Sequence, residues 1–164
     1  MNSSGEGVKI YCPNHSSYLD IIVCYLVIPH KFLFLGKAEL LRWPLFRIFF
    51  KHMDIAVNRG NKLQAARSVV QCGKALKTGW SLVIFPEGTI SKKAPELFPF
   101  KPGAFKIAEQ FNVDIVPVSF VGNWRVLNVS HWNSKSLPGR IQAFVHNKLT
   151  LPSDLDLSAK REAL

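Results

Sequence analysis

The chain has 164 residues, 48% of them apolar, and a formal net charge of +10. This length is typical of one domain, and the apolar fraction is sufficient for one hydrophobic core, so we expect a single domain over residues 1–164. The three cysteines are odd in number and contain no Cys-x-x-Cys pair, so they indicate neither a disulfide framework nor a zinc site. We therefore expect no metal, and the positive charge predicts an anionic partner.

Strand-like and helix-like segments alternate along the chain. In chain order we expect a strand at 8–12, a helix at 17–28, a strand at 31–35, a helix at 43–51, a strand at 53–57, a helix at 62–77, a strand at 81–85, a helix at 103–111, and strands at 114–120 and 140–145. Residues 86–102 are expected to form a long loop, and residues 123–139 to be irregular. This alternation predicts an α/β fold, with a mostly parallel or mixed central sheet flanked by helices.

Three polar segments each follow a predicted strand of this sheet. They are residues 13–17, 58–59 and 86–89. Crossovers between parallel strands bring the carboxyl ends of those strands to one edge of the sheet, where ligands of open α/β sheets bind. We therefore expect the three segments to gather at one site.

A histidine stands just before the first apolar helix, in Asn14-His15-Ser16-Ser17-Tyr18-Leu19-Asp20. Asp20 follows five positions later, in the first turns of that helix, close enough for its carboxylate to bond the ring. Such a bond would fix the tautomer of His15 and stabilise the imidazolium that forms when the ring takes up a proton. The pair is a candidate general base, although in isolation the two residues are more typical of an ordinary helix entrance.

A second block, Phe85-Pro86-Glu87-Gly88-Thr89, presents a carboxylate, a glycine amide and a hydroxyl in one turn after a strand. In this order, the Asn-His-x4-Asp and Phe-Pro-Glu-Gly-Thr blocks resemble the signature motifs of PlsC-like glycerolipid acyltransferases, typified by 1-acylglycerol-3-phosphate acyltransferases. The resemblance covers residues 8–150. Three weaker blocks fall in the same order, namely a strand ending in Arg59, Phe100-Lys101-Pro102-Gly103-Ala104-Phe105 and Ile115-Val116-Pro117-Val118.

The resemblance implies a glycerol-phosphate acyltransferase-like fold and an O-acyltransferase that needs no cofactor. The donor would be an acyl-CoA or acyl carrier protein thioester, and the acceptor a lysophospholipid. His15 would be the general base and Asp20 would orient it. The favoured acceptor is 1-acylglycerol-3-phosphate, giving phosphatidate, with glycerol 3-phosphate or a lyso-aminolipid as alternatives. The implied substrate-binding residues are Asn14, Arg59, Glu87, Gly88, Thr89 and Lys101.

The chemistry of these side chains refines the expected acceptor site. Arg59 is the favoured phosphate partner because a guanidinium forms paired, charge-assisted hydrogen bonds, and Lys101 or Lys37 would add a second positive charge. Glu87 has the same charge sign as a phosphate, so we assign its carboxylate to an acceptor hydroxyl, the loop backbone or Arg59. The Gly88 amide is one candidate donor for the oxyanion of the reaction.

Residues 31–62 contain seven Lys or Arg side chains and two acidic ones, interleaved with aromatic side chains. This mixture favours a membrane surface over nucleic acid as the anionic partner. The most apolar run, residues 21–28, is too short to span a bilayer, so we expect peripheral attachment at the cytoplasmic face of the membrane. Because no anchoring segment precedes the first strand, we expect residues 1–164 to be a truncated domain. A non-catalytic, basic membrane-surface module is the alternative from another class.

Overall fold

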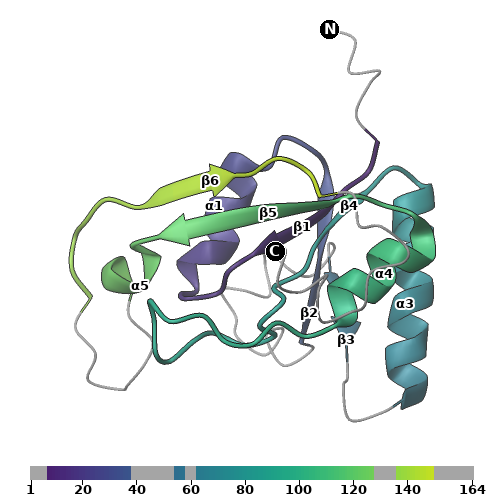
Figure 1. The fold of residues 1–164 in the computed structure, drawn as a ribbon, viewed down its shortest axis with the longest axis horizontal. Helices are drawn as coiled ribbons and strands as arrows, with labels where there is room; N and C mark the ends of the chain where they lie inside the picture. The colour runs from purple at the N-terminus through teal and green to yellow at the C-terminus, as the bar shows by residue number, and fades with distance from the viewer. Residues whose placement is uncertain (1–6, 38–53, 58–61, 128–135, 150–164) are drawn as a thin grey trace, which may run out of the picture.

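The computed structural model describes residues 7–37, 54–57, 62–127 and 136–149. Six strands form one sheet in the order β3-β2-β4-β1-β5-β6 (Figure 1). The strands are β1 (Ile10–Pro13), β2 (Phe32–Lys37), β3 (Asp54–Val57), β4 (Ser81–Val83), β5 (Ile115–Val121) and β6 (Gln142–Val145). The helices are α1 (Leu19–Val27), α3 (Lys62–Lys77), α4 (Gly103–Phe111) and α5 (Asn123–Val126).

The sheet is mostly parallel. Central strand β1 pairs in parallel with β4 and β5, and β2 pairs in parallel with β4 and β3. The edge strand β6 runs antiparallel to β5. The predicted α/β fold with a mostly parallel sheet is therefore confirmed. Because β1 and β4 are parallel neighbours, the loops that follow them meet at one edge of the sheet, as expected.

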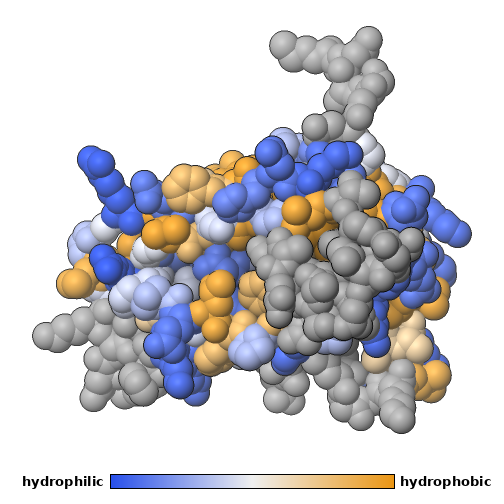
Figure 2. Space-filling model, in the orientation of Figure 1, coloured by the Kyte–Doolittle hydropathy of each residue, from blue (hydrophilic) through white to orange (hydrophobic). Residues whose placement is uncertain are grey.

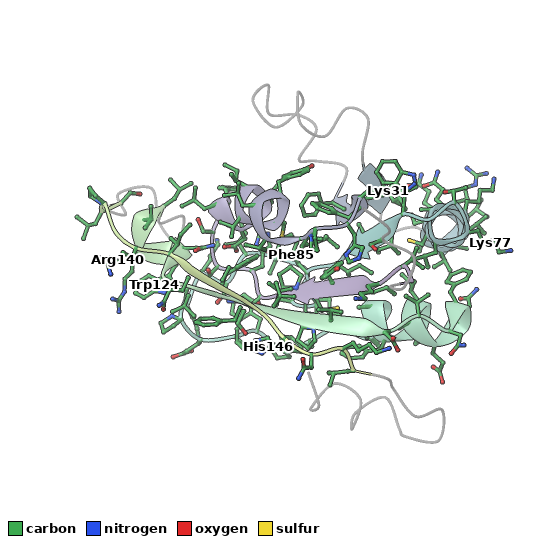
Figure 3. The ribbon with its side chains drawn as sticks, turned by 90° about the horizontal axis from the view of Figure 1, so that it is seen from above. Lys31, Lys77, Phe85, Trp124, Arg140 and His146 are labelled. Carbon is green, nitrogen blue, oxygen red and sulfur yellow. The ribbon has the colours of Figure 1, made fainter. Side chains whose placement is uncertain are left out.

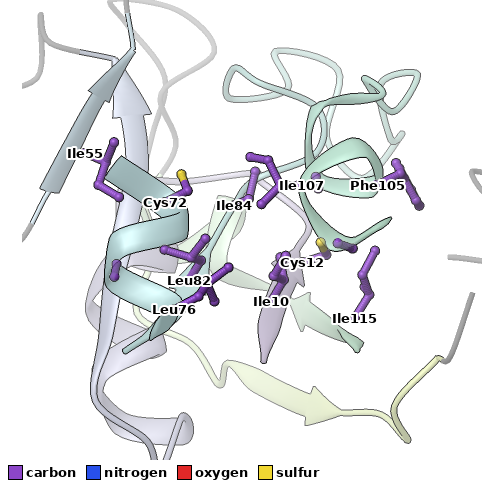
Figure 4. Packing of buried hydrophobic residues seen from close by; sticks show 13 residues of the cluster. Ile10, Cys12, Ile55, Cys72, Leu76, Leu82, Ile84, Phe105, Ile107 and Ile115 are labelled. Atoms are coloured by element: carbon purple, nitrogen blue, oxygen red, sulfur yellow. The ribbon is translucent and has the colours of Figure 1, made fainter. Parts of the chain in front are cut away.

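Helices cover both faces of the sheet (Figure 1). Along β1, Ile10 and Cys12 face the core cluster that contains α3 and α4, whereas Tyr11 faces the cluster that contains α1. This alternation is the period of two that every strand imposes on its side chains. Both faces of β1 are thus buried, which explains why its sequence is apolar throughout. Figure 4 shows the cluster on the α3 and α4 side.

The two helices on that side pack closely against each other and against the sheet. Cys72, Ala75 and Leu76 lie on one face of α3, at the spacing that brings helical side chains together, and all three are buried. At Gly73 a Cβ atom would lie 2.5 Å from the ring of Phe111, so the absence of a side chain allows α3 and α4 to approach. Directly after Phe111, α4 stops at Asn112, whose φ of 49° is left-handed.

Most predicted strand bounds shift by one or two residues, and three differences from the sequence-based expectation lie beside His15 or its partners. The helix predicted at 17–28 is shorter, because residues 15–18 form the turn that presents His15. The strand predicted at 81–85 ends at Val83, two residues before Phe85, whose ring stacks on His15. The expectation that residues 123–139 are irregular is wrong at its start, where α5 forms.

Gly122 makes that short helix possible. Its φ is 90°, which L side chains rarely adopt, and a Cβ there would lie 2.9 Å from the carbonyl oxygen of Arg140. The helix predicted at residues 43–51 lies outside the described residues. Across the described ranges, no helix combines the length and the apolar character needed to cross a bilayer.

Candidate active site

His15 and Asp20 contact each other at the entrance of α1. Nδ1 of His15 lies 3.0 Å from Oδ2 of Asp20. The same Oδ2 accepts the backbone N–H groups of Ser16 and Ser17, at 2.6 and 2.8 Å. A carboxylate oxygen in such a position is an acceptor, so Nδ1 of His15 carries a proton, and in the neutral ring Nε2 has the lone pair. The predicted bond between the two side chains is therefore present.

The Asp20 carboxylate is fully buried and its hydrogen-bonding capacity is well used. Its second oxygen, Oδ1, accepts the side-chain amide of Asn123 at 2.7 Å. Burying an ionised carboxylate is costly unless donors replace the lost water, and here three N–H donors surround it besides His15. These donors replace the water that the buried carboxylate has lost.

The ring of His15 is also held by aromatic stacking. Phe85 stacks on His15 with ring centroids 3.9 Å apart and an interplanar angle of 19°, and Phe34 lies parallel to Phe85 at 6.1 Å. Figure 3 shows Phe85 near the centre of the molecule, beneath α1. Stacking fixes the plane of the imidazole, and the bond to Asp20 fixes its rotation within that plane.

Glu87 joins the two loops at the edge of the sheet. Its Oε1 accepts the backbone N–H of His15 at 2.7 Å, and its Oε2 accepts the backbone N–H of Phe98 at 2.9 Å. The side chain is 2% exposed, and this burial raises the pKa of Glu87, whereas the two backbone hydrogen bonds and His15 act in the opposite direction. Of the three partners considered for Glu87, its carboxylate contacts the loop backbone.

The long loop after β4 is closed and docked on His15. The N–H of Lys101 donates to the carbonyl oxygen of Pro86 at 2.8 Å, which joins the two ends of the loop. The N–H of Ser91 donates to the carbonyl oxygen of His15, also at 2.8 Å. The backbone of His15 is therefore bonded through its N–H and its C=O to one loop, and that loop cannot shift without moving the candidate base.

The remaining predicted site residues occupy several positions. The side-chain amide of Asn14 forms two bonds with the backbone of Phe120, of 3.1 and 2.6 Å, so it joins β1 to β5. Gly88 has a φ of 72°, and its N–H donates to the carbonyl oxygen of Phe85 at 3.0 Å, which commits the amide to the turn rather than to an oxyanion. Thr89 and Lys101 are exposed. Arg59 lies outside the described residues.

A pocket of about 260 Å³ opens beside His15. Its walls are Asn14, His15, Ser16, Glu87, Ser91, Pro95, Glu96, Leu97, Ser119, Phe120, Val121, Gly122 and Trp124. Asn14, His15 and Glu87 were predicted as site residues, and Asp20 lies directly behind His15. The pocket is a concave space in which a substrate group can reach the imidazole.

Sequence reasoning missed Asn123 and Trp124, which follow β5. Two facts explain this: the contact from Asn123 to Asp20 spans 103 positions of the chain, and α5 is too short to produce a periodic pattern. One signal was available, because Gly122-Asn123 follows a buried strand. The same sheet-edge reasoning that selected residues 13–17 and 86–89 applies to this segment.

Comparison with known proteins agrees with this geometry. The acyltransferase family matches residues 2–121. The 1-acyl-sn-glycerol-3-phosphate acyltransferase of Cocos nucifera is 36% identical over 121 residues, which are 71% of this chain and 39% of the relative. The protein of the same name from Helicobacter pylori is 32% identical over 129 residues, which are 78% of this chain and 54% of the relative.

A solved structure shares the fold. The crystal structure of PlsC, the 1-acyl-sn-glycerophosphate (LPA) acyltransferase of Thermotoga maritima, matches with a TM-score of 0.76 and 24% identity, over 99% of this chain and 65% of that one. The chain thus spans less than two thirds of the length of each of these relatives. The family match covers well over half of the chain, and the resemblance of the two sequence blocks is confirmed: the chain belongs to the acyltransferase family.

Proposed function

We propose that the chain is the catalytic region of an enzyme that transfers a fatty acyl group from a thioester to the free hydroxyl of 1-acylglycerol-3-phosphate, giving phosphatidate. The observation that carries this proposal is the His15–Asp20 pair at a pocket, with Nδ1 bonded to Asp20 at 3.0 Å. The relatives from Cocos nucifera and Helicobacter pylori, whose names state this acceptor, support the choice of substrate.

The proposed reaction needs one general base. Nε2 of His15 takes the proton of the acceptor hydroxyl, and the hydroxyl oxygen forms a bond to the thioester carbonyl carbon. The tetrahedral intermediate then collapses, the carbon–sulfur bond breaks, and the thiolate takes the proton from His15 and leaves as a thiol. Asp20 stabilises the imidazolium between these two steps. Acyl-CoA or acyl carrier protein supplies the activated carbonyl, so the reaction requires neither a protein nucleophile nor a cofactor.

The acceptor phosphate is proposed to bind Arg59, because a guanidinium forms paired, charge-assisted hydrogen bonds with a phosphate. Thr89 and Lys101, which are exposed on the loop after β4, are proposed to provide a hydroxyl and a positive charge. Glu87 acts from behind this site by holding the loop, because both of its oxygens bond backbone N–H groups. Its contribution to acceptor binding is therefore indirect.

The first test replaces His15 by alanine. We expect His15→Ala to lower kcat for acyl transfer to lysophosphatidate by at least about a hundredfold, the usual contribution of a general base. The matched control is His30→Ala, which removes a histidine bonded to Tyr11 rather than to Asp20 and should keep kcat near the wild-type value. Undiminished transfer by His15→Ala would refute the catalytic role.

The acceptor is tested with one radiolabelled acyl-CoA and a panel of lysophosphatidate, glycerol 3-phosphate and lyso-aminolipids, repeated with acyl carrier protein as donor. Lysophosphatidate should give the highest kcat/KM. A higher value for glycerol 3-phosphate or for a lyso-aminolipid would transfer the proposal to that acceptor, with the same base.

We also propose that the protein acts as a peripheral protein at the cytoplasmic face of a membrane. Leu97 and Val121, both on the pocket wall, are 56% and 51% exposed, and the Arg125 guanidinium lies 5.0 Å from the ring centroid of Trp124. Apolar and hydrophilic side chains adjoin each other on the face that carries β5, β6 and α5 (Figure 2). Such a mixture suits the boundary between headgroups and acyl chains.

Flotation with vesicles tests this attachment. The chain should float with vesicles of phosphatidylcholine and phosphatidylglycerol, and less so with phosphatidylcholine alone, because its net charge is +10. Binding that persists in His15→Ala without any acyl transfer by the wild type would instead identify a non-catalytic surface module.

A further inference from the structure

Asn123 is fully buried and bonds the carboxylate behind the candidate base. Its Nδ2 donates to Oδ1 of Asp20 at 2.7 Å. A carboxylate offers only acceptors, so the nitrogen of the amide must face Asp20, which settles the orientation of the side chain. Within the described part of the chain, Oδ1 of Asn123 has no hydrogen-bond partner.

That unsatisfied carbonyl oxygen makes asparagine an unfavourable choice for stability alone. A buried polar atom without a partner destabilises the folded state, and an apolar side chain of similar shape would avoid this cost. The amide nitrogen must therefore provide something that an apolar side chain cannot. Among the residues that the structure describes, this nitrogen donates its hydrogen bond to Asp20.

The two carboxylate oxygens of Asp20 have hydrogen-bond partners on opposite sides of the site. Oδ2 contacts Nδ1 of His15 and the backbone N–H groups of Ser16 and Ser17, all from the segment just before α1. Oδ1 is bonded from the other side of the site by Asn123, at the start of α5. Donors on both oxygens fix the rotation of the carboxylate plane, which keeps Oδ2 directed at the imidazole.

The short helix α5 is anchored well enough to hold that donor in place. At its N-terminal side Gly122 adopts the left-handed φ of 90° that the turn requires. At its C-terminal side the hydroxyl of Ser17 donates to the carbonyl oxygen of Leu127 at 2.9 Å. The helix therefore follows β5 through a defined turn at Gly122, and its other end is bonded to the entrance of α1.

We propose that Asn123 is a positioning residue for the acyl transfer, which keeps the Asp20 carboxylate aligned on Nδ1 of His15. This inference rests on the proposed function for its kinetic test. The mechanism is electrostatic and geometric: when the amide donor is absent, the negative charge of Asp20 is less dispersed and its plane is less restrained. His15 then holds its proton more strongly and transfers it from a less uniform orientation.

The kinetic test compares Asn123→Ala with Asn112→Ala. The control changes Asn112, the residue with left-handed backbone angles that follows α4 away from the site. Asn112→Ala destabilises the protein because alanine tolerates these backbone angles less well than asparagine. Asn123→Ala should lower kcat about tenfold, as expected for one hydrogen bond to a charged group, with little change in the KM for lysophosphatidate. Asn112→Ala should leave both constants near the wild-type values.

The pH profile separates positioning from general destabilisation. The charged groups that face His15 within the described residues are Asp20 on α1 and Glu87 and Glu96 on the loop after β4. With the amide removed, the imidazolium is more strongly stabilised, so the acidic limb of the kcat profile should move to higher pH. A structural role alone would lower the amount of folded protein and leave this limb in place.

A conservative variant provides the rescue. Asn123→Ser keeps a hydroxyl donor at the same position and should recover part of the kcat lost in Asn123→Ala, with equal folded fractions by circular dichroism. Equal kcat values and equal pH profiles for wild type, Asn123→Ser and Asn123→Ala would overturn the inference.

A measurement without substrate keeps the inference independent of the acceptor. The proton NMR resonance of Nδ1–H of His15 should shift in Asn123→Ala and stay in place in Asn112→Ala. If the wild type transfers no acyl group to any acceptor, the proposed function fails while this resonance still tests the alignment. A resonance that is unchanged in Asn123→Ala would refute the alignment, whatever the activity.

Discussion

Replacing Glu87 by glutamine tests whether the loop after β4 supports the base through this one carboxylate. Glu87→Gln keeps the size of the side chain but exchanges one acceptor oxygen for a donor. The two backbone N–H groups of His15 and Phe98 now bond separate oxygens at 2.7 and 2.9 Å, so one of them must face an NH2 group in the variant. The charge-assisted character of the remaining bond is lost as well.

The magnitude follows from these two bonds. A hydrogen bond to a charged group contributes about 1.5–3 kcal/mol, and the amide avoids the desolvation of a buried charge, which is the effect that raises the pKa of Glu87. Because the avoided desolvation partly offsets the weakened hydrogen bonds, we expect the free energy of unfolding to fall by roughly 1–2 kcal/mol. Because the backbone of His15 moves with the loop, we also expect kcat for acyl transfer to be lower in Glu87→Gln.

For Glu87→Gln, urea unfolding measures the change in the free energy of unfolding, and steady-state acyl transfer measures the change in kcat. The matched control is Glu109→Gln, the same substitution at an exposed position on α4, which should change the free energy of unfolding by less than about 0.5 kcal/mol. Equal stability and equal kcat for Glu87→Gln and wild type would refute the role of this carboxylate as the link between the two loops.

Two further predictions concern the backbone and the thiols. Gly122→Ala should lower the free energy of unfolding by roughly 1–3 kcal/mol, because φ is 90° and the new Cβ would lie 2.9 Å from a backbone oxygen. The control is Gly103→Ala, whose Cβ meets no atom within 4 Å and which should be neutral or stabilising in the same urea titration. Burial raises the pKa of Cys72 to about 12 and also raises the pKa values of Cys12 and Cys24. Above pH 9 the unfolded chain therefore loses thiol protons that the folded chain keeps, so the free energy of unfolding should fall by about 1 kcal/mol per thiol between pH 9 and 10. If Cys72→Ala showed the same dependence of this free energy on pH as the wild type, the prediction would be contradicted.

The elements that sequence reasoning located best are those whose pattern is local. The helices at 62–77 and 103–111 have the bounds that their apolar periodicity and flanking Gly and Pro residues predict. The His15–Asp20 bond is similarly local, since the two residues flank one helix entrance. Such contacts depend on a few consecutive backbone angles and hardly on the rest of the fold.

The other contacts depend on which strands are neighbours. Glu87 reaches His15 because β4 lies beside β1, and Asn123 reaches Asp20 because β5 lies on the other side of β1. The alternation of strands and helices predicts that strand ends meet at one edge, but it does not predict the strand order. The convergence of residues 13–17 and 86–89 was therefore predictable, whereas the partners of each carboxylate were not.

The strand order also explains how firmly the candidate base is held. His15 follows the central strand, so elements from both neighbouring strands contact it: the loop after β4 bonds its backbone, and Asn123 after β5 bonds its carboxylate partner. With its ring stacked on Phe85 and Nδ1 on Asp20, the group left for a substrate is Nε2. A base restrained in this way loses little orientational entropy in the reaction, which favours a fixed catalytic centre.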